Sequence, residues 1–242
     1  MPDDIRLKIQ RASKHINELH GVVQEFKKTN PYKVDSKRDP QTGEHIVYIH
    51  SADPIPPTIP IIAGDVIQNL YSSLDYLASK LVIANGNKPT SKTAFPITKN
   101  IPTTKDEVAR YEGQVSGMRQ EVKDLLKGMN LYRGANNSFW RLHKLNNINK
   151  HRSLVTMGFQ PSSFGAWGDL IDQVKMNFGP LEQGSEVARF PPDAENHKDV
   201  HFVIDIAISE PEADAVDYPL IVALRLCHNT VKRAVHNFEI YR

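Results

Sequence analysis

Residues 65–86 read DVIQNLYSSLDYLASKLVIANG, and the pattern of this stretch decides the fold. Apolar side chains recur three or four positions apart, at Ile67, Leu70, Leu74, Leu77 and Leu81. This spacing places them on one face of a helix, whose start Asp65 can cap and whose end the Asn85-Gly86 pair marks. We therefore expect a central helix near residues 64–84.

Two further long helices are expected near the ends of the chain, at residues 3–28 and 219–239. The first carries an apolar stripe of Ile5, Ile9, Ala12, Ile16, Leu19, Val23 and Phe26. The second carries a stripe of Leu220, Leu224, Cys227, Val231, Val235 and Phe238. Such stripes pack against other helices, so we predict a bundle in which Cys227 fills the core and is not a nucleophile. A homodimeric coiled coil through residues 3–28 is the alternative, which a stripe shorter than four heptads disfavours.

The segments between these helices mix both kinds of secondary structure. Two extended runs around a DPQTG turn predict a β-hairpin at 32–50, and the proline-rich SADPIPPTIP after it predicts a non-helical connector. Helices are expected near 104–128, with Gly113 ending or kinking the first part, and near 137–152; alternating apolar residues predict strands within 153–209. The expected fold is α+β, a long-helix bundle packed with a small antiparallel β-sheet, and we treat 1–242 as a single domain.

The composition is ordinary for a soluble chain, with 40% hydrophobic and 24% charged residues. The start, MPDDIRLKIQ, lacks the apolar stretch of a signal peptide, and no apolar run is long enough to cross a membrane. The only cysteine is Cys227, so no disulfide can form within the chain. These features predict a cytoplasmic protein with no membrane partner.

The stretch at 142–155, LHKLNNINKHRSLV, carries histidines, asparagines and cations without a carboxylate. It lies in an acid-free window between Asp124 and Asp169 that holds six Lys and Arg residues. The window therefore carries a charge of +6, and because the formal net charge of the chain is +2, the remainder carries −4. A solvated helix normally mixes Glu with Lys, so this surplus of donors suits an anion. Nearby aromatic residues, Trp140 among them, suggest a nucleic-acid ligand. Its bases would stack on the aromatic rings while the cations neutralise its phosphates.

On a helical wheel the polar residues of this stretch fall into two groups. His143, Asn147 and Lys150 lie opposite the apolar arc, in the sector that usually just faces water. Arg152 points toward the core instead, where a guanidinium needs a carboxylate, and Asp75 of the central helix is the best candidate for an ion pair. If His151 takes Asp75 instead, the carboxylate would orient the imidazole as a catalytic dyad does.

Three functional hypotheses follow. The leading one is a protein of unassigned function that binds an anionic ligand or nucleic acid through ligand-binding residues Asn147, Lys150, Lys144, Arg152, Trp140 and Asn69. The alternative is a metal-independent phosphodiesterase or ribonuclease with His151 and His143 as acid and base and Asp75 as the orienting group. The third is a structural or interaction module without chemistry. Nucleotide-binding motifs and HExxH-like histidine spacings are absent from the sequence, so we assign no cofactor and no metal.

Two stretches together resemble a group of uncharacterised bacterial proteins. In that group a helix of the type GDxxxNLxSxLDxL, here residues 64–77, precedes a segment that ends in KHR, here 150–152. The resemblance singles out Asp65, Asn69, Leu74 and Asp75 on the helix and Lys150, His151 and Arg152 on the segment; it implies no activity.

A looser similarity is to the helical HEPN ribonucleases, whose active residues are an Arg and a His on one helix with four to six residues between them. Here only Arg38 and His45 have this spacing, and they straddle the DPQTG turn. The similarity therefore implies at most a helical fold.

Overall fold

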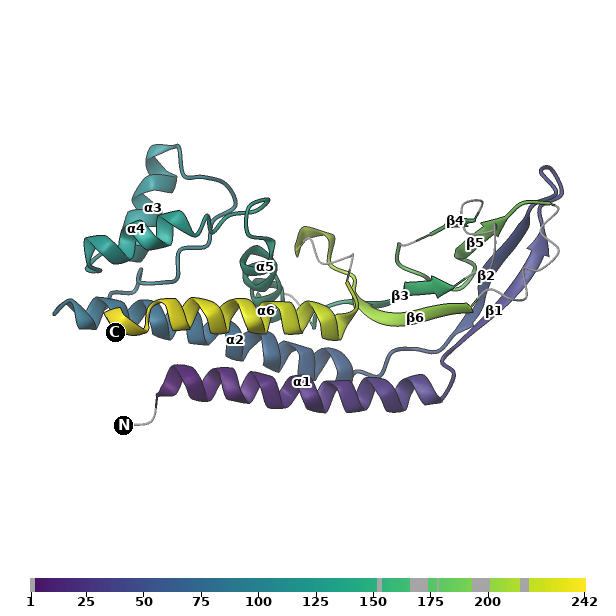
Figure 1. The fold of residues 1–242 in the computed structure, drawn as a ribbon, viewed down its shortest axis with the longest axis horizontal. Coiled ribbons are helices and arrows are strands. Elements are labelled where there is room, and N and C mark those ends of the chain that lie inside the picture. The colour runs from purple at the N-terminus through teal and green to yellow at the C-terminus, as the bar shows by residue number, and fades with distance from the viewer. Residues whose placement is uncertain (1–2, 152–153, 166–173, 178, 193–200, 214–217) are drawn as a thin grey trace.

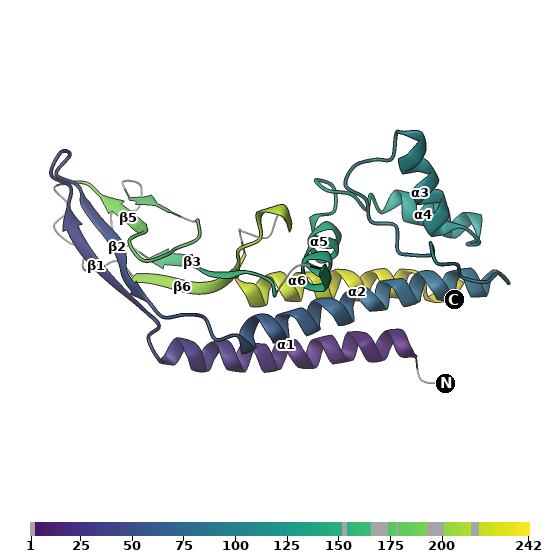
Figure 2. The ribbon, with the colours of Figure 1, turned by 180° about the vertical axis from the view of Figure 1, so that it is seen from behind.

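Three long helices lie side by side along the computed structural model: α1 (Asp4–Lys28), α2 (Thr58–Ala84) and α6 (Leu220–Asn237) (Figure 1). The structure describes residues 3–151, 154–165, 174–177, 179–192, 201–213 and 218–242. Seen from either side, α1 runs opposite to α2, while α6 runs in the same direction as α2 (Figure 2). The expected bundle of N-terminal, central and C-terminal helices is confirmed.

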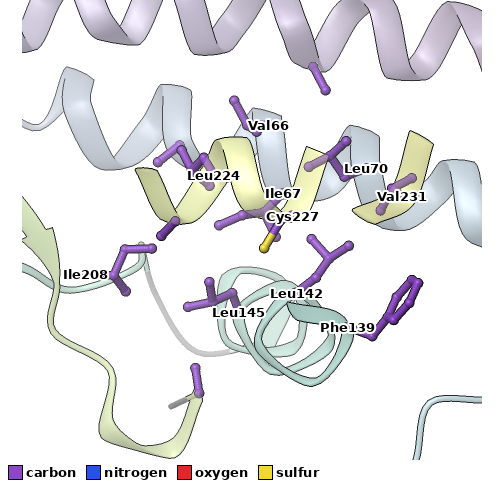
Figure 3. Packing of buried hydrophobic residues seen from close by; sticks show 14 of the residues in the cluster. Val66, Ile67, Leu70, Phe139, Leu142, Leu145, Ile208, Leu224, Cys227 and Val231 are labelled. Atoms are coloured by element: carbon purple, nitrogen blue, oxygen red, sulfur yellow. The ribbon is translucent and has the colours of Figure 1, made fainter. Parts of the chain in front are cut away.

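The core forms where the predicted apolar stripes meet. Helix α1 buries its stripe from Ile5 to Val23, and α2 buries one broad face that runs from Ile59 to Val82. Helix α5 (Asn137–His151) lies across α2 and α6, with Leu142 and Leu145 pointing into the space between them (Figure 3). Burial of one such leucine stabilises the fold by about 1.5–3 kcal/mol. Cys227 lies in the same core, where burial raises the pKa of its thiol to about 11, so the prediction that it is core is confirmed.

Two expectations about helix boundaries were wrong. Helix α2 begins at Thr58, inside the proline-rich segment predicted to be a non-helical connector. Pro60 lies in the first turn, where no intrahelical N–H bond is lost, so the helix tolerates it.

The helical region at 104–128 is divided into α3 (Lys105–Val115) and α4 (Gln120–Gly128). The helix passes through Gly113 and breaks at Gly117, which has a φ of +83°. A Cβ at Gly117 would also meet the Val82 side chain at 3.1 Å, so glycine is required there.

The strands form two sheets instead of the single sheet expected. The first has the order β1 (Tyr32–Arg38), β2 (His45–Ala52), β5 (Glu186–Phe190) and β4 (Lys175–Met176), with antiparallel neighbours. The second pairs β3 (Met157–Gly165) with β6 (His201–Ile208). Together they form an arm at the end of the bundle where α1 finishes, and β3 and β6 contact the last turn of α1 through Phe26 and Lys27 (Figure 1). The β1–β2 hairpin is confirmed.

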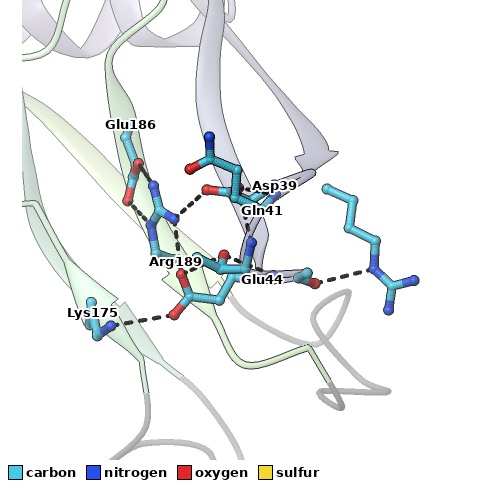
Figure 4. A network of polar contacts seen from close by, with 9 residues as sticks. Asp39, Gln41, Glu44, Lys175, Glu186 and Arg189 are labelled. Carbon is cyan, nitrogen blue, oxygen red and sulfur yellow. Dashed lines mark hydrogen bonds and ion pairs between the residues drawn. The ribbon is translucent and has the colours of Figure 1, made fainter.

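A polar network fastens the tip of this arm (Figure 4). The guanidinium of Arg189 pairs with Asp39 at 2.8 Å, with Glu44 at 2.9 Å and with Glu186 at 3.0 Å. The hydrogen bond from Arg189 is the main reason that the pKa of Glu44 lies below its usual value. The network ties the hairpin turn to β5.

The described residues include no helix with the length and apolar character of a membrane span. They also include no group of three or more His, Cys, Asp or Glu side chains arranged to hold a metal ion.

Candidate functional site

Five side chains from two helices meet where α5 crosses α2, and we call them the His143 cluster: Tyr71, Asp75, His143, Asn147 and Lys150. Tyr71 and Asp75 are one turn apart on α2, so they share a face. The other three come from the sector of α5 predicted from the wheel. That sector faces α2 in part, because His143 and Asn147 are only partly exposed while Lys150 is exposed.

His143 has a hydrogen-bond partner at each ring nitrogen. Its Nδ1 lies 3.0 Å from the Tyr71 hydroxyl, and the side-chain Nδ2 of Asn147 lies 3.1 Å from its Nε2. The amide nitrogen of Asn147 can only donate, so Nε2 accepts and the ring proton is on Nδ1, which donates to Tyr71. Burial lowers the pKa of His143 to about 4, and the charges of Arg110 and Lys144 act in the same direction. His143 is therefore neutral at pH 7.

Asp75 is a partly buried carboxylate with an unused oxygen. Burial raises its pKa, against the lowering effects of a hydrogen bond from the Phe95 main chain and of the Lys150 charge. Its Oδ1 is buried and meets no hydrogen-bond donor in the described part of the chain. Burial, and then the negative charge of Asp75, raise the pKa of the Tyr71 hydroxyl, which keeps that hydroxyl protonated.

Cations from two helices lie in this cluster and beside it. The Lys150 Nζ lies 5.9 Å from the centroid of the Tyr71 ring, and Arg110 of α3 is exposed near enough to lower the pKa of His143. Lys144 is less available, because its Nζ pairs with Glu212 at 3.1 Å. The carboxylate missing from the acid-free window is thus supplied to Lys144 by a later segment.

Two other predicted ligand-binding residues, Trp140 and Asn69, contact neighbouring residues of the fold. Trp140 is 6% exposed, its ring lies 5.9 Å from the His143 ring, and its Nε1 meets no acceptor in the described residues. Asn69 donates from Nδ2 to the main-chain oxygen of Asp65 at 2.8 Å, within its own helix. Burial of Trp140 leaves little of its ring for a base to stack on.

The predicted partners of Asp75 do not meet it in the described structure. His151 is exposed at the last residue of α5, and no contact found among the described residues joins it to Asp75 or His143. Arg152, the expected ion-pair partner, lies outside the described residues. Arg38 and His45, the pair with HEPN-like spacing, are cross-strand partners in the arm.

One close contact between α2 and α5 was not predicted from the sequence. A Cβ at Gly64 would lie 2.6 Å from Oδ1 of Asn149, so the absence of a side chain lets the Asn149 amide pack against α2. Gly64 is the first residue of the GDxxxNLxSxLDxL pattern, which could have drawn attention to it. Arg110 has no such local signal.

No protein-family model, curated protein or solved structure matches this chain significantly.

Proposed function

We propose that the protein binds a phosphate-bearing ligand at the His143 cluster. The observation that carries the proposal is the double hydrogen bonding of His143, which leaves each of its two partners with one donor that His143 does not use. Nδ2 of Asn147 gives one N–H to His143 and has a second one left. The Tyr71 oxygen accepts a hydrogen bond from the Nδ1–H of His143, so the Tyr71 O–H can still donate to another group.

Charge supports the same ligand. Lys150 and Arg110 are exposed cations beside these neutral donors, and charge-assisted hydrogen bonds to phosphate are among the stronger ones in proteins. Phosphate offers several acceptor oxygens, which matches the N–H and O–H groups of Asn147 and Tyr71. The Asp75 carboxylate of the cluster opposes an anion, and the positive charges of Lys150 and Arg110 offset it. Lys150, Arg110, Asn147 and Tyr71 are the residues that we assign to binding.

The phosphodiesterase or ribonuclease alternative has no comparable support. It needs His143 as an acid or a base near neutral pH, whereas both ring nitrogens are hydrogen-bonded and the pKa is lowered to about 4. We therefore assign His143 a positioning role, in which it holds Asn147 and Tyr71.

Binding of a labelled single-stranded RNA, followed by fluorescence anisotropy over a range of salt concentrations, tests this proposal. Each phosphate contact contributes about −0.7 to the slope of log affinity against log salt, so Lys150→Ala should weaken binding and make the slope about 0.7 shallower. Lys14→Ala is the matched control, because Lys14 is exposed on α1 and loses the same charge. Inorganic pyrophosphate should compete with the RNA if a phosphate group is what the site recognises. Equal affinities for Lys150→Ala and Lys14→Ala would contradict the proposal.

A further inference from the structure

A pocket of about 310 Å³ lies between α3, the end of α4 and the segments 96–102 and 130–132. Its walls include Ile101, Val108, Tyr111, Glu112, Leu126 and Leu131. None of these residues belongs to the His143 cluster, so the pocket is a separate feature.

The walls of the pocket are held in place without a ligand. The main-chain N–H of Thr98 donates to the carbonyl of Leu131 at 2.9 Å, which joins the two segments. A capping box fixes the start of α3: Thr104 Oγ1 accepts from the Glu107 N–H at 3.3 Å, and Glu107 Oε2 accepts from the Thr104 N–H at 3.1 Å. A preformed pocket of this kind loses little conformational entropy on binding.

The lining is mainly apolar and continues into exposed apolar surface. Leu126 and Leu131 are buried in the wall, whereas Ile101 is 58% exposed and Val108 is 42% exposed. An apolar molecule in the pocket would remove these two side chains from water, which is favourable.

The polar groups of the pocket restrict the ligand further. The Tyr111 hydroxyl is buried and has no hydrogen-bond partner in the described part of the chain. The Thr98 hydroxyl already donates to the Asn100 carbonyl at 2.7 Å. Glu112 and Lys127 bring one negative and one positive charge, so the lining carries no net charge. A neutral molecule with one hydrogen-bonding group fits this set.

The volume limits the size of that molecule. A water molecule takes roughly 30 Å³ of liquid, so the pocket has room for roughly ten, about the bulk of one or two fused rings. We infer that this pocket binds a neutral molecule of one or two fused rings that bears a single hydroxyl or carbonyl group. The inference is independent of phosphate binding at the His143 cluster.

Titration of the full chain with 1-naphthol, followed by calorimetry, tests the inference. The wild-type protein should bind one equivalent saturably. Val108→Trp fills the pocket from a partly exposed position and should weaken binding at least about tenfold, whereas Val222→Trp, a similarly exposed position on α6, should leave binding unchanged. Tyr111→Phe should weaken binding about fivefold, the equivalent of one net hydrogen bond.

Each measurement in this titration has one outcome that would overturn the inference. Absence of saturable binding to the wild type, or equal binding to a folded Val108→Trp protein, would exclude the pocket. Ile101→Asp provides a second test if Val108→Trp does not fold, because it places a charge at an exposed apolar wall and should also weaken binding. Unchanged affinity in Tyr111→Phe, or tighter binding of the anion 1-naphthoate, would exclude the proposed class of ligand.

Discussion

The hydroxyl of Tyr71 lies 3.0 Å from Nδ1 of His143 and joins α2 to α5 across 72 positions of sequence. This contact makes His143 a neutral link between the helices, since Asn147 occupies its other nitrogen. The stability of the α2–α5 junction and the donors of the proposed site therefore depend on the same hydrogen bonds.

Removing the Tyr71 hydroxyl should destabilise the protein. Tyr71→Phe leaves the partly buried Nδ1–H of His143 without an acceptor, which should lower the free energy of unfolding by about 1–2 kcal/mol. Tyr76→Phe is the control on the same helix, because Tyr76 is 42% exposed. Urea unfolding of both variants measures the difference, and equal values would show that the contact does not stabilise the junction.

His143 should make folding stability depend on pH. Burial, together with Arg110 and Lys144, lowers its pKa to about 4, whereas an unfolded histidine titrates near 6.5. Between these values the unfolded chain binds more protons at this residue, so its contribution is complete above pH 6.5 and is lost as the pH falls toward 4. Asp75, with its raised pKa, acts in the opposite direction.

The His143→Gln variant isolates this effect, because glutamine does not titrate. From pH 6.5 to pH 5 the wild type should lose stability relative to the variant by up to about 1.4 kcal/mol per pH unit. Unfolding by urea at several pH values gives both curves, and parallel curves would mean that His143 titrates alike in both states.

The close approach of α5 to α2 at Gly64 should be sensitive to one added methyl group. Gly64→Ala forces the Asn149 amide away from the helix, and overpacking of this kind costs about 1–3 kcal/mol. Gly21→Ala on α1 meets nothing within 4 Å and should instead stabilise the helix by up to about 1 kcal/mol. Thermal unfolding compares the two, and an equal gain in both would contradict the proposed packing role of Gly64.

The arm tip should loosen when its central cation is removed. Arg189→Met removes the group that binds Asp39, Glu44 and Glu186, so amide exchange in the turn at 39–44 should become faster. Lys33→Met, an exposed position on β1, should not change that exchange. Hydrogen exchange read by mass spectrometry would show equal rates in both variants if the network does not hold the turn.

Much of the fold follows from local pattern. The stripes of the three long helices, the DPQTG hairpin and the alternating strands can be read from spacing alone, because each depends on neighbouring residues. The start of α2 was missed because prolines forbid helix interiors but not first turns. The division into two sheets was also missed, because strand pairing is set by contacts distant in sequence.

Some residues of the candidate site could likewise be predicted from local sequence, whereas others are brought in by the packing of the fold. The sector of His143, Asn147 and Lys150 follows from the helical period, but Arg110 and Tyr71 join it only through packing between helices. Lys144 lies in an acid-free window of the sequence, but the fold brings the distant Glu212 beside it. The predicted pair of Asp75 with Arg152 stays a prediction, because Arg152 lies outside the described residues.

Binding of a phosphate group at the His143 cluster is the proposal on which the assigned binding residues depend. Two-dimensional ¹H–¹⁵N spectra recorded during titration with inorganic pyrophosphate test it most directly. We expect the side-chain NH₂ signals of Asn147 to shift saturably, and we expect Lys150→Ala to weaken this response while Lys14→Ala does not. No shift at Asn147, or the same titration curve in both variants, would contradict the claim.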